Sequence, residues 1–229
     1  MILWPGKIGW GDVISPICIA ARLDEPLTFV WGRRGTPWAR AAADFIAKNH
    51  EKPVEVHHVE GELVGQHSKA TWDDSDPMHN VGFARAGMRW RQQERDDPDW
   101  IRFALTTPES NLEELPEHKQ WKLGNVAWGS AARRLMEDGP GGVRRVDYRT
   151  PTEDAAYIIR HADVHVGYHG NASWLARWLG IPQIVVSSRK SQTQRSFPHA
   201  VVVSELGFAG TKYVRGLVDG AREKAVQWP

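Results

Sequence analysis

Cysteine is almost absent from this sequence, since the chain of 229 residues contains only Cys18. A single thiol excludes an internal disulfide framework and a zinc cluster built from cysteines. Long apolar runs are also missing, because no segment approaches the roughly 18 apolar residues that span a bilayer. The first residues lack the basic region and the apolar stretch of an export signal. We therefore expect a cytoplasmic protein without membrane insertion.

Net charge is small as well, because 29 basic residues nearly balance 28 acidic ones. The bulk charge therefore predicts no polyanionic partner. The basic residues nevertheless gather in short groups, two of which, Arg33-Arg34 and Arg189-Lys190, follow predicted strands. Both pairs are expected to flank the same crevice, so a nucleic-acid contact stays open there.

Tryptophan is the abundant aromatic residue, with 12 tryptophans against 4 tyrosines and 6 phenylalanines. Large aromatic side chains stabilise cores and interfaces, and we expect most of the tryptophans there. A minority could offer stacking surfaces for a base or a sugar ring. Hydrophobic residues make up 41% and charged residues 25% of the chain, as in ordinary globular domains.

Short apolar runs alternate with amphipathic stretches, a pattern typical of βαβ units and a mainly parallel sheet. A polar stretch at 60–80 interrupts the pattern, which begins again at Trp100. The sequence therefore predicts an α/β fold with two Rossmann-like doubly wound lobes, residues 1–97 and 98–229, that meet near residues 96–99. Strands are predicted at 1–4, 27–31, 54–59, 100–105, 143–147, 164–167, 183–186 and 200–203. Helices are predicted at about 13–22, 37–49, 81–95, 125–136, 151–161, 173–179 and from 211.

Ligands of doubly wound sheets bind at the carboxyl ends of strands, where the strand order switches. The first such end carries a loop, Lys7, Gly9, Trp10 and Gly11, that leads to Asp12. Glycines there let the backbone approach a ligand, and a helix that opens at about Asp12 points its N–H groups at it. The glycine spacing does not match a dinucleotide fingerprint. Asp12 is either the cap of this helix or a carboxylate placed to take a proton.

Two later strand ends also carry polar residues. Thr106 and Thr107 follow a strand, with Lys119 about a dozen residues on, which suits phosphate or ribose contacts or an ordinary capped turn. The turn His169-Gly170-Asn171-Ala172-Ser173 leads from a strand into a helix. It suits a diphosphate, with Ser173 or Asn171 as the cap and His169 as a donor, or it is only a tight turn.

The chain opens on Ile-Leu-Trp-Pro-Gly-Lys-Ile-Gly-Trp-Gly-Asp-Val-Ile-Ser-Pro, and residues 159–186 read as an apolar strand, a small polar turn, a helix, Gly-Ile-Pro and a strand. Between them lies Lys119-Gln120-Trp121. In this order the three segments resemble the heptosyltransferase-like glycosyltransferases of the GT-B fold. Where that family usually has Asp-Ser-Gly or Asp-Thr-Gly and a later histidine, this chain has His169-Gly170-Asn171 and Trp174.

The resemblance implies a glycosyltransferase whose first lobe takes the acceptor and whose second lobe takes a nucleotide diphosphate sugar. It makes Asp12 the base that deprotonates an acceptor hydroxyl, Lys119 a contact to the donor phosphates, and residues 169–173 the cradle of the donor diphosphate. It requires no cofactor and no metal, because helix N-termini and Lys119 can neutralise the leaving diphosphate. The acidic runs at 73–76 and 96–97 lie in polar stretches and are interpreted as solvated loops.

The acceptor stays open between a saccharide or other small molecule and a hydroxymethylated base in DNA, as in phage enzymes of this fold. In the DNA case the arginine pairs would contact the duplex, and Trp10 or Trp72 would act as a wedge. A noncatalytic or hydrolytic nucleotide-binding protein on the same fold is the third alternative.

Overall fold

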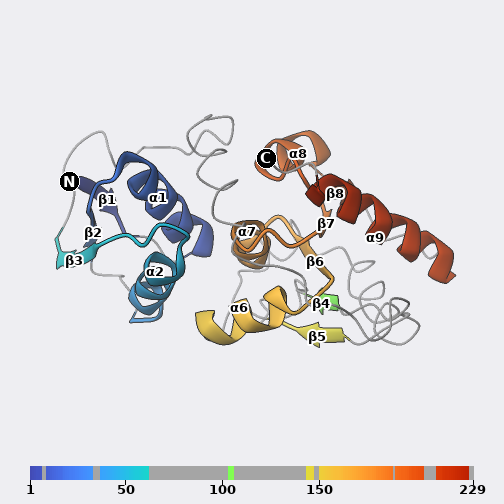
Figure 1. Ribbon diagram of the computed structural model, residues 1–229, viewed down its shortest axis with the longest axis horizontal. Coiled ribbons are helices and arrows are strands. Elements are labelled where there is room, and N and C mark those ends of the chain that lie inside the picture. The colour runs from blue at the N-terminus through green and yellow to red at the C-terminus, as the bar shows by residue number, and fades with distance from the viewer. Residues whose placement is uncertain are drawn as a thin grey trace, which may run out of the picture.

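The computed structural model describes residues 1–6, 9–32, 37–61, 103–105, 143–146, 150–187, 189–203 and 210–226. They form a mixed α/β fold with two separate parallel sheets (Figure 1). The predicted boundary at 96–99 and the helices predicted at 81–95 and 125–136 lie outside these residues, as does almost all of the polar stretch at 60–80.

The first sheet has the order β1-β2-β3, and all its strands are parallel. Its strands are β1 (Ile2–Pro5), β2 (Leu27–Trp31) and β3 (Val56–Glu60), connected by the helices α1 (Trp10–Leu23) and α2 (Pro37–Asn49). The two helices contact each other and cover one face of the sheet (Figure 1). The ranges of β2 and α2 are those predicted, and Pro37 opens α2, where its fixed φ and missing N–H suit a first helical residue.

The second sheet has the order β5-β4-β6-β7-β8 and is also parallel throughout. Its strands are β4 (Phe103–Leu105), β5 (Val143–Arg145), β6 (Val164–Tyr168), β7 (Gln183–Val186) and β8 (Val201–Val203). Its helices are α6 (Thr152–Arg160), α7 (Asn171–Trp178), α8 (Lys190–Ser196) and α9 (Gly210–Val226). The chain passes from β4 outward to β5 and then crosses to β6 on the other side of β4. The strand order therefore switches between β4 and β6, the place where doubly wound sheets bind ligands.

Several predicted elements differ from the structure. The segment between the strands predicted at 183–186 and 200–203, where no helix was predicted, contains α8. The first helix begins at Trp10, two residues before Asp12. Pro151, expected as the first residue of its helix, is the N-cap of α6 instead, and Thr152 is the first helical residue.

The two sheets share one buried core. Helix α1 packs against α7 and α2 packs against α6, as Figure 1 shows between the sheets. Trp10 of α1 is 1% exposed, lies 5.5 Å from the Trp38 ring between centroids, and donates from Nε1 to Thr152 Oγ1 at 2.9 Å. This bond joins the first residue of α6 to α1 of the other sheet. The buried hydrophobic cluster runs without a break from α1 and α2 into α6 and α7.

Small residues let α1 and α7 approach. Gly11, Ser15 and Cys18 lie on one face of α1 by helical periodicity, and a Cβ on Gly11 would lie 2.9 Å from Trp174 Cδ1 of α7.

Burial raises the pKa of the Cys18 thiol to about 12, and the positive charge of Arg177 in α7 partly opposes the rise. The Cys18 thiol is therefore protonated at neutral pH.

Gly11→Ala is expected to destabilise the fold by about 1–3 kcal/mol, because the added methyl overpacks the contact with Trp174. Gly216→Ala in α9 is the matched control, since a Cβ there meets no atom within 4 Å. That control is expected to stabilise the protein by about 0.5–1 kcal/mol through helix propensity alone. Urea unfolding of both variants measures the difference, and a stabilising Gly11→Ala would show that α1 and α7 do not touch there.

Candidate functional site

The carboxyl end of β1 leads into the first turn of α1. Gly9 is the N-cap and Asp12 is the third helical residue. The Gly9 N–H donates to Asp12 Oδ2 at 3.3 Å. The prediction that Asp12 caps the helix is therefore wrong. Its carboxylate instead reaches back to the backbone of a cap residue that has no side chain of its own, as the third residue of a capping box does.

The glycines near this helix start were expected to let the backbone approach a ligand closely. At two of them, Gly6 and Gly11, a tryptophan ring of the chain packs against the backbone instead. A Cβ on Gly6 would fall 2.2 Å from Trp31 Cε3, and a Cβ on Gly11 would fall 2.9 Å from Trp174 Cδ1. At these two positions the close approach is made by a side chain of the protein itself. Lys7 lies outside the described residues.

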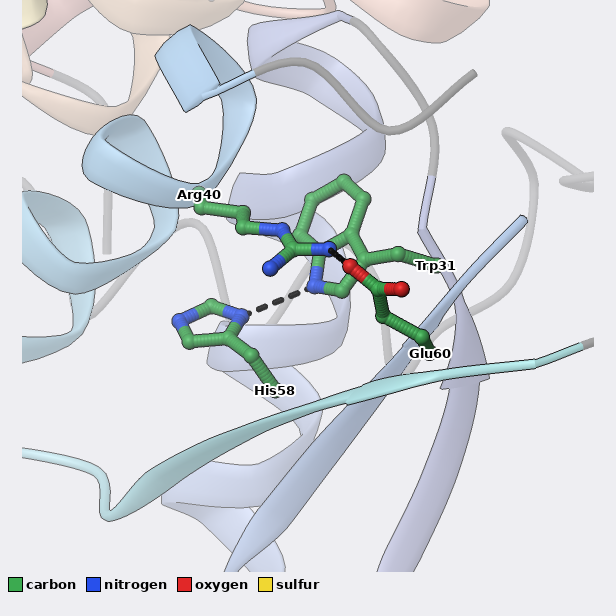
Figure 2. A network of polar contacts seen from close by, with 4 residues as sticks. All are labelled: Trp31, Arg40, His58 and Glu60. Carbon is green, nitrogen blue, oxygen red and sulfur yellow. Dashed lines mark hydrogen bonds and ion pairs between the residues drawn. The ribbon is translucent and has the colours of Figure 1, made fainter. Parts of the chain in front are cut away.

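A hydrogen-bonded network fixes the Trp31 ring (Figure 2). Trp31 Nε1–H donates to His58 Nδ1 at 2.9 Å. His58 Nε2 lies 2.8 Å from Asp44 Oδ1. Because Nδ1 accepts, Nε2 carries the proton and donates to the Asp44 carboxylate. The Arg40 guanidinium lies over the indole, 5.7 Å from its centroid, and donates to Glu60 Oε1 at 3.1 Å. The sequence offered no sign of this role for His58 beyond its place on a strand.

Gly6→Ala is expected to lower the free energy of unfolding by about 1–3 kcal/mol, because the methyl must displace a buried ring that His58 holds. Gly32→Ala provides the control. Gly32 also directly follows a strand, yet a Cβ on it meets nothing within 4 Å, so a change within about 0.5 kcal/mol is expected. Equal changes in the free energy of unfolding for Gly6→Ala and Gly32→Ala would show that the Trp31 ring can move to make room for the methyl group.

The carboxyl end of β6 leads through His169 into α7. Gly170 is the N-cap and Asn171 is the first helical residue, so neither Asn171 nor Ser173 is the cap that the sequence predicted. Ser173 is 1% exposed, and its Oγ donates to the Tyr168 carbonyl at 2.6 Å. That bond connects the first turn of α7 to the end of β6, so the buried Ser173 hydroxyl stabilises the conformation of the turn.

A buried histidine supports this turn. His165 of β6 is fully buried, which lowers its pKa to about 3, and a hydrogen bond with the Gln183 side chain partly opposes the shift. A Cβ on Gly167 would fall 2.5 Å from His165 Cε1. The neutral imidazole thus fills the space that a side chain at residue 167 would take.

Aromatic rings and one buried cation surround the first turn of α7. Trp174 lies 4.7 Å from Phe197 and 6.3 Å from His169 between ring centroids. The Arg177 guanidinium is 1% exposed, lies 5.6 Å from the Trp174 ring centroid and donates to the Ser196 carbonyl. Burial lowers the pKa of His199, and the charges of Arg177 and then Lys224 lower it further. Arg177 therefore places a buried positive charge beside the Trp174 ring.

The contact of Gly11 with Trp174 brings two of the predicted segments together. Gly11 precedes Asp12 in the first turn of α1, and Trp174 follows the turn at 169–173. The first turns of α1 and α7 therefore lie side by side where the two sheets meet. Thr106 and Thr107 follow β4, the other strand of that switch point, but they and Lys119 lie outside the described residues.

The residues predicted to contact nucleic acid differ in where they lie. Trp10 is buried between α1 and α6 with its indole N–H bonded, so it is neither a loop residue nor a wedge for a flipped base. Arg189 and Lys190 are exposed at the start of α8, after β7, as the sequence placed them. Arg33, Arg34 and Trp72 lie outside the described residues.

No protein-family model matches this chain, and no curated protein matches it. Among solved structures, the chain is similar to the dodecameric iron-containing heptosyltransferase TibC in complex with ADP-D-beta-D-heptose. The two chains are 12% identical, with a TM-score of 0.45 and coverage of 99% of this chain and 76% of the other. At that score the likeness carries no argument about function.

Two further properties bear on chemistry and location. Within the described ranges, no three histidine, cysteine, aspartate or glutamate side chains come close enough to hold a metal ion. None of the helices in these ranges has the length and apolar character needed to cross a membrane. The acidic runs at 73–76 and 96–97 lie outside them.

Proposed function

We propose that this protein is a glycosyltransferase of the GT-B type that moves a sugar from a nucleotide diphosphate sugar to an acceptor hydroxyl. The observation that carries the proposal is the position of the turn at 169–173. The turn lies at the carboxyl end of β6, beside the switch between β4 and β6, and α7 packs there against the first turn of α1. The sequence segments that resemble heptosyltransferase-like enzymes are the same two segments.

The donor diphosphate binds at the N-terminus of α7 in this proposal. A helix N-terminus attracts an anion by about 0.3–1 kcal/mol when exposed and up to about 2 kcal/mol when partly buried. The buried charge of Arg177 against the Trp174 ring adds to the attraction. Lys119 contacts the phosphates, and Thr106 and Thr107 contact the phosphates or the ribose from the end of β4.

Asp12 is the general base on the acceptor side. It takes the proton of the acceptor hydroxyl as that oxygen attacks the anomeric carbon, and the bond from this carbon to the diphosphate oxygen breaks. The Gly9 N–H bond holds the carboxylate in place at the start of α1. Positive charge at the leaving diphosphate comes from the helix terminus and Lys119, so the reaction as proposed uses no metal or other cofactor.

The acceptor in this proposal is a saccharide or another small molecule. The DNA alternative used the arginine pairs as duplex contacts and either Trp10 or Trp72 as the wedge. Of the two tryptophans, Trp10 is buried at the interface of the helices, and Trp72 lies outside the described residues.

Titration calorimetry of the full chain with UDP, ADP and GDP sugars, followed by transfer assays with saccharide acceptors, tests the proposal. Lys119→Ala is expected to weaken binding of the nucleotide diphosphates more than binding of the matching nucleosides, because only the diphosphates carry the charge that lysine meets. Equal losses for both would remove the phosphate role of Lys119. A wild-type chain that binds none of the nucleotides or their sugars would contradict the proposed function itself.

A further inference from the structure

Trp10 and Thr152 meet at the interface between the two sheets. Trp10 is the first residue of α1 and Thr152 is the first residue of α6, and both are buried, with exposed fractions of 1% and 6%. The indole Nε1–H donates to Thr152 Oγ1 at 2.9 Å. The ring of Trp38, in the first turn of α2, lies 5.5 Å from the Trp10 ring between centroids. Three helices from the two sheets therefore meet around one indole.

Apolar side chains make up the buried cluster around this bond. The cluster includes residues of α1, α2, α6 and α7, and α1 packs against α7 while α2 packs against α6 (Figure 1). Apolar burial is non-directional and depends mainly on the area removed from water. Such packing stabilises the contact between the sheets, but it does not by itself select one angle between them.

A buried hydrogen bond is directional. The two sheets can slide or rotate against each other only if the indole N–H and the threonine hydroxyl separate inside the core, where an unpaired polar group is costly. One arrangement of the sheets therefore keeps the bond. Asp12 lies two residues after Trp10, in the first turn of α1, so its place relative to the second sheet depends on the same arrangement.

We propose that the Trp10–Thr152 bond sets the angle at which the two sheets dock, and that both residues are positioning residues for sugar transfer. The docking role is independent of the proposed function, whereas the positioning role rests on it. Each residue acts through the placement of Asp12 and the first turn of α1 relative to α7. This role replaces the acceptor contact that the sequence predicted for Trp10.

A double-mutant cycle of urea unfolding measures the bond itself. Thr152→Val keeps the shape and removes the hydroxyl, so it is expected to lower the folding equilibrium constant by about tenfold, because the buried indole N–H loses its acceptor. In a Trp10→Phe background that N–H is gone, and the same substitution is expected to change the constant by less than about twofold. An equal effect in both backgrounds would show no coupling and would overturn the proposal.

Pulsed electron paramagnetic resonance between two spin labels tests the docking angle. The labels are attached at Lys48→Cys in α2 and Glu223→Cys in α9, which are exposed helical positions on the two sides of the interface. Cys18 does not compete for the label, because its thiol is buried and protonated at neutral pH. The chain with native Thr152 and its Thr152→Ser variant are expected to give one narrow distance distribution, and Thr152→Val a wider or shifted one.

Thr193→Val is the matched control for the distance measurement. Thr193 is also a fully buried threonine whose hydroxyl donates a hydrogen bond, to Ser187 Oγ at 2.8 Å, but both residues follow β7 within the second sheet. This control is expected to lower stability and to leave the distance distribution unchanged. A distribution in Thr152→Val that matches the chain with native Thr152 overturns the docking role, and so does an equal widening in Thr193→Val.

A variant that keeps no unpaired group covers the case in which Thr152→Val does not fold. Trp10→Phe combined with Thr152→Val removes the donor and the acceptor together, so no polar atom of this pair is left buried without a partner. Its distance distribution is expected to be wider than that of the chain with both native residues. A distribution as narrow as the native one would show that apolar packing alone sets the angle, and would overturn the docking role.

The rate of sugar transfer tests the positioning role. Thr152→Val is expected to lower turnover by up to about a hundredfold, because a displacement of about 1 Å at the reacting groups can cost that much, and to leave the donor affinity unchanged. Thr152→Ser is expected to keep turnover near wild type. Undiminished turnover in a Thr152→Val chain with a widened distribution overturns the positioning role. A wild-type chain that binds no nucleotide sugar removes the proposed function and this role with it, while the distance measurements still decide the docking role.

Discussion

Asp12→Asn is expected to lower the turnover of sugar transfer by roughly 10²–10⁴. Asparagine cannot take the proton of the acceptor hydroxyl, but its side-chain oxygen can still accept the Gly9 N–H bond that Asp12 Oδ2 accepts at 3.3 Å. The fold and the donor affinity are therefore expected to change little. Initial rates at saturating donor, together with donor titration and urea unfolding of the same preparation, measure the three quantities.

Asp154→Asn is the matched control for this experiment. Asp154 is the third helical residue of α6, as Asp12 is of α1, and it is exposed. Both substitutions remove a negative charge from the first turn of a helix, a loss of about 0.3–1 kcal/mol in each case. Only Asp12→Asn is expected to lower turnover. A rate within a few-fold of wild type would leave Asp12 as a residue of the helix terminus with no part in proton transfer.

Much of the fold was predictable because its elements carry strong local signals. The strand β2 and the helix α2 match their predicted ranges, since an apolar run ends at Gly32 and proline opens the helix at Pro37. The start of α1 was missed because its cap is Gly9, which has no side chain to signal a cap. The helix α8 was missed because its buried face is made of Thr193 and Ser196. Polar residues of that kind give no apolar periodicity to read.

The candidate site was predictable only in its parts. The sequence placed Asp12 and the turn at 169–173 at strand ends, because strands and helices alternate there. That Gly11 meets Trp174, and that Thr193 reaches His169, depends on how helices from distant segments pack. Such contacts leave no local pattern in the sequence. The same reason hid the burial of Trp10, whose partner Thr152 lies 142 residues away.

Lowering the pH from 6.5 to 4.5 is expected to destabilise the protein by roughly 2–3 kcal/mol through His165 alone. Burial lowers the pKa of this histidine from 6.5 to about 3, so in this range the unfolded chain takes up a proton that the folded chain does not. Stability is thus full above pH 6.5 and falls by about 1.4 kcal/mol per pH unit below it. His199, whose pKa burial also lowers, adds to the fall in the same direction.

The informative quantity is therefore the difference in slope between wild type and His165→Asn, measured by urea unfolding at several pH values between 4.5 and 7. His165→Asn cannot take up the proton in either state, so its stability is expected to fall less steeply by about 1.4 kcal/mol per unit, whatever its stability at pH 7. Parallel slopes for wild type and His165→Asn would mean that the imidazole beneath the turn at 169–173 is protonated as readily in the folded chain as in water, and that the β6–α7 turn does not rest on a neutral ring.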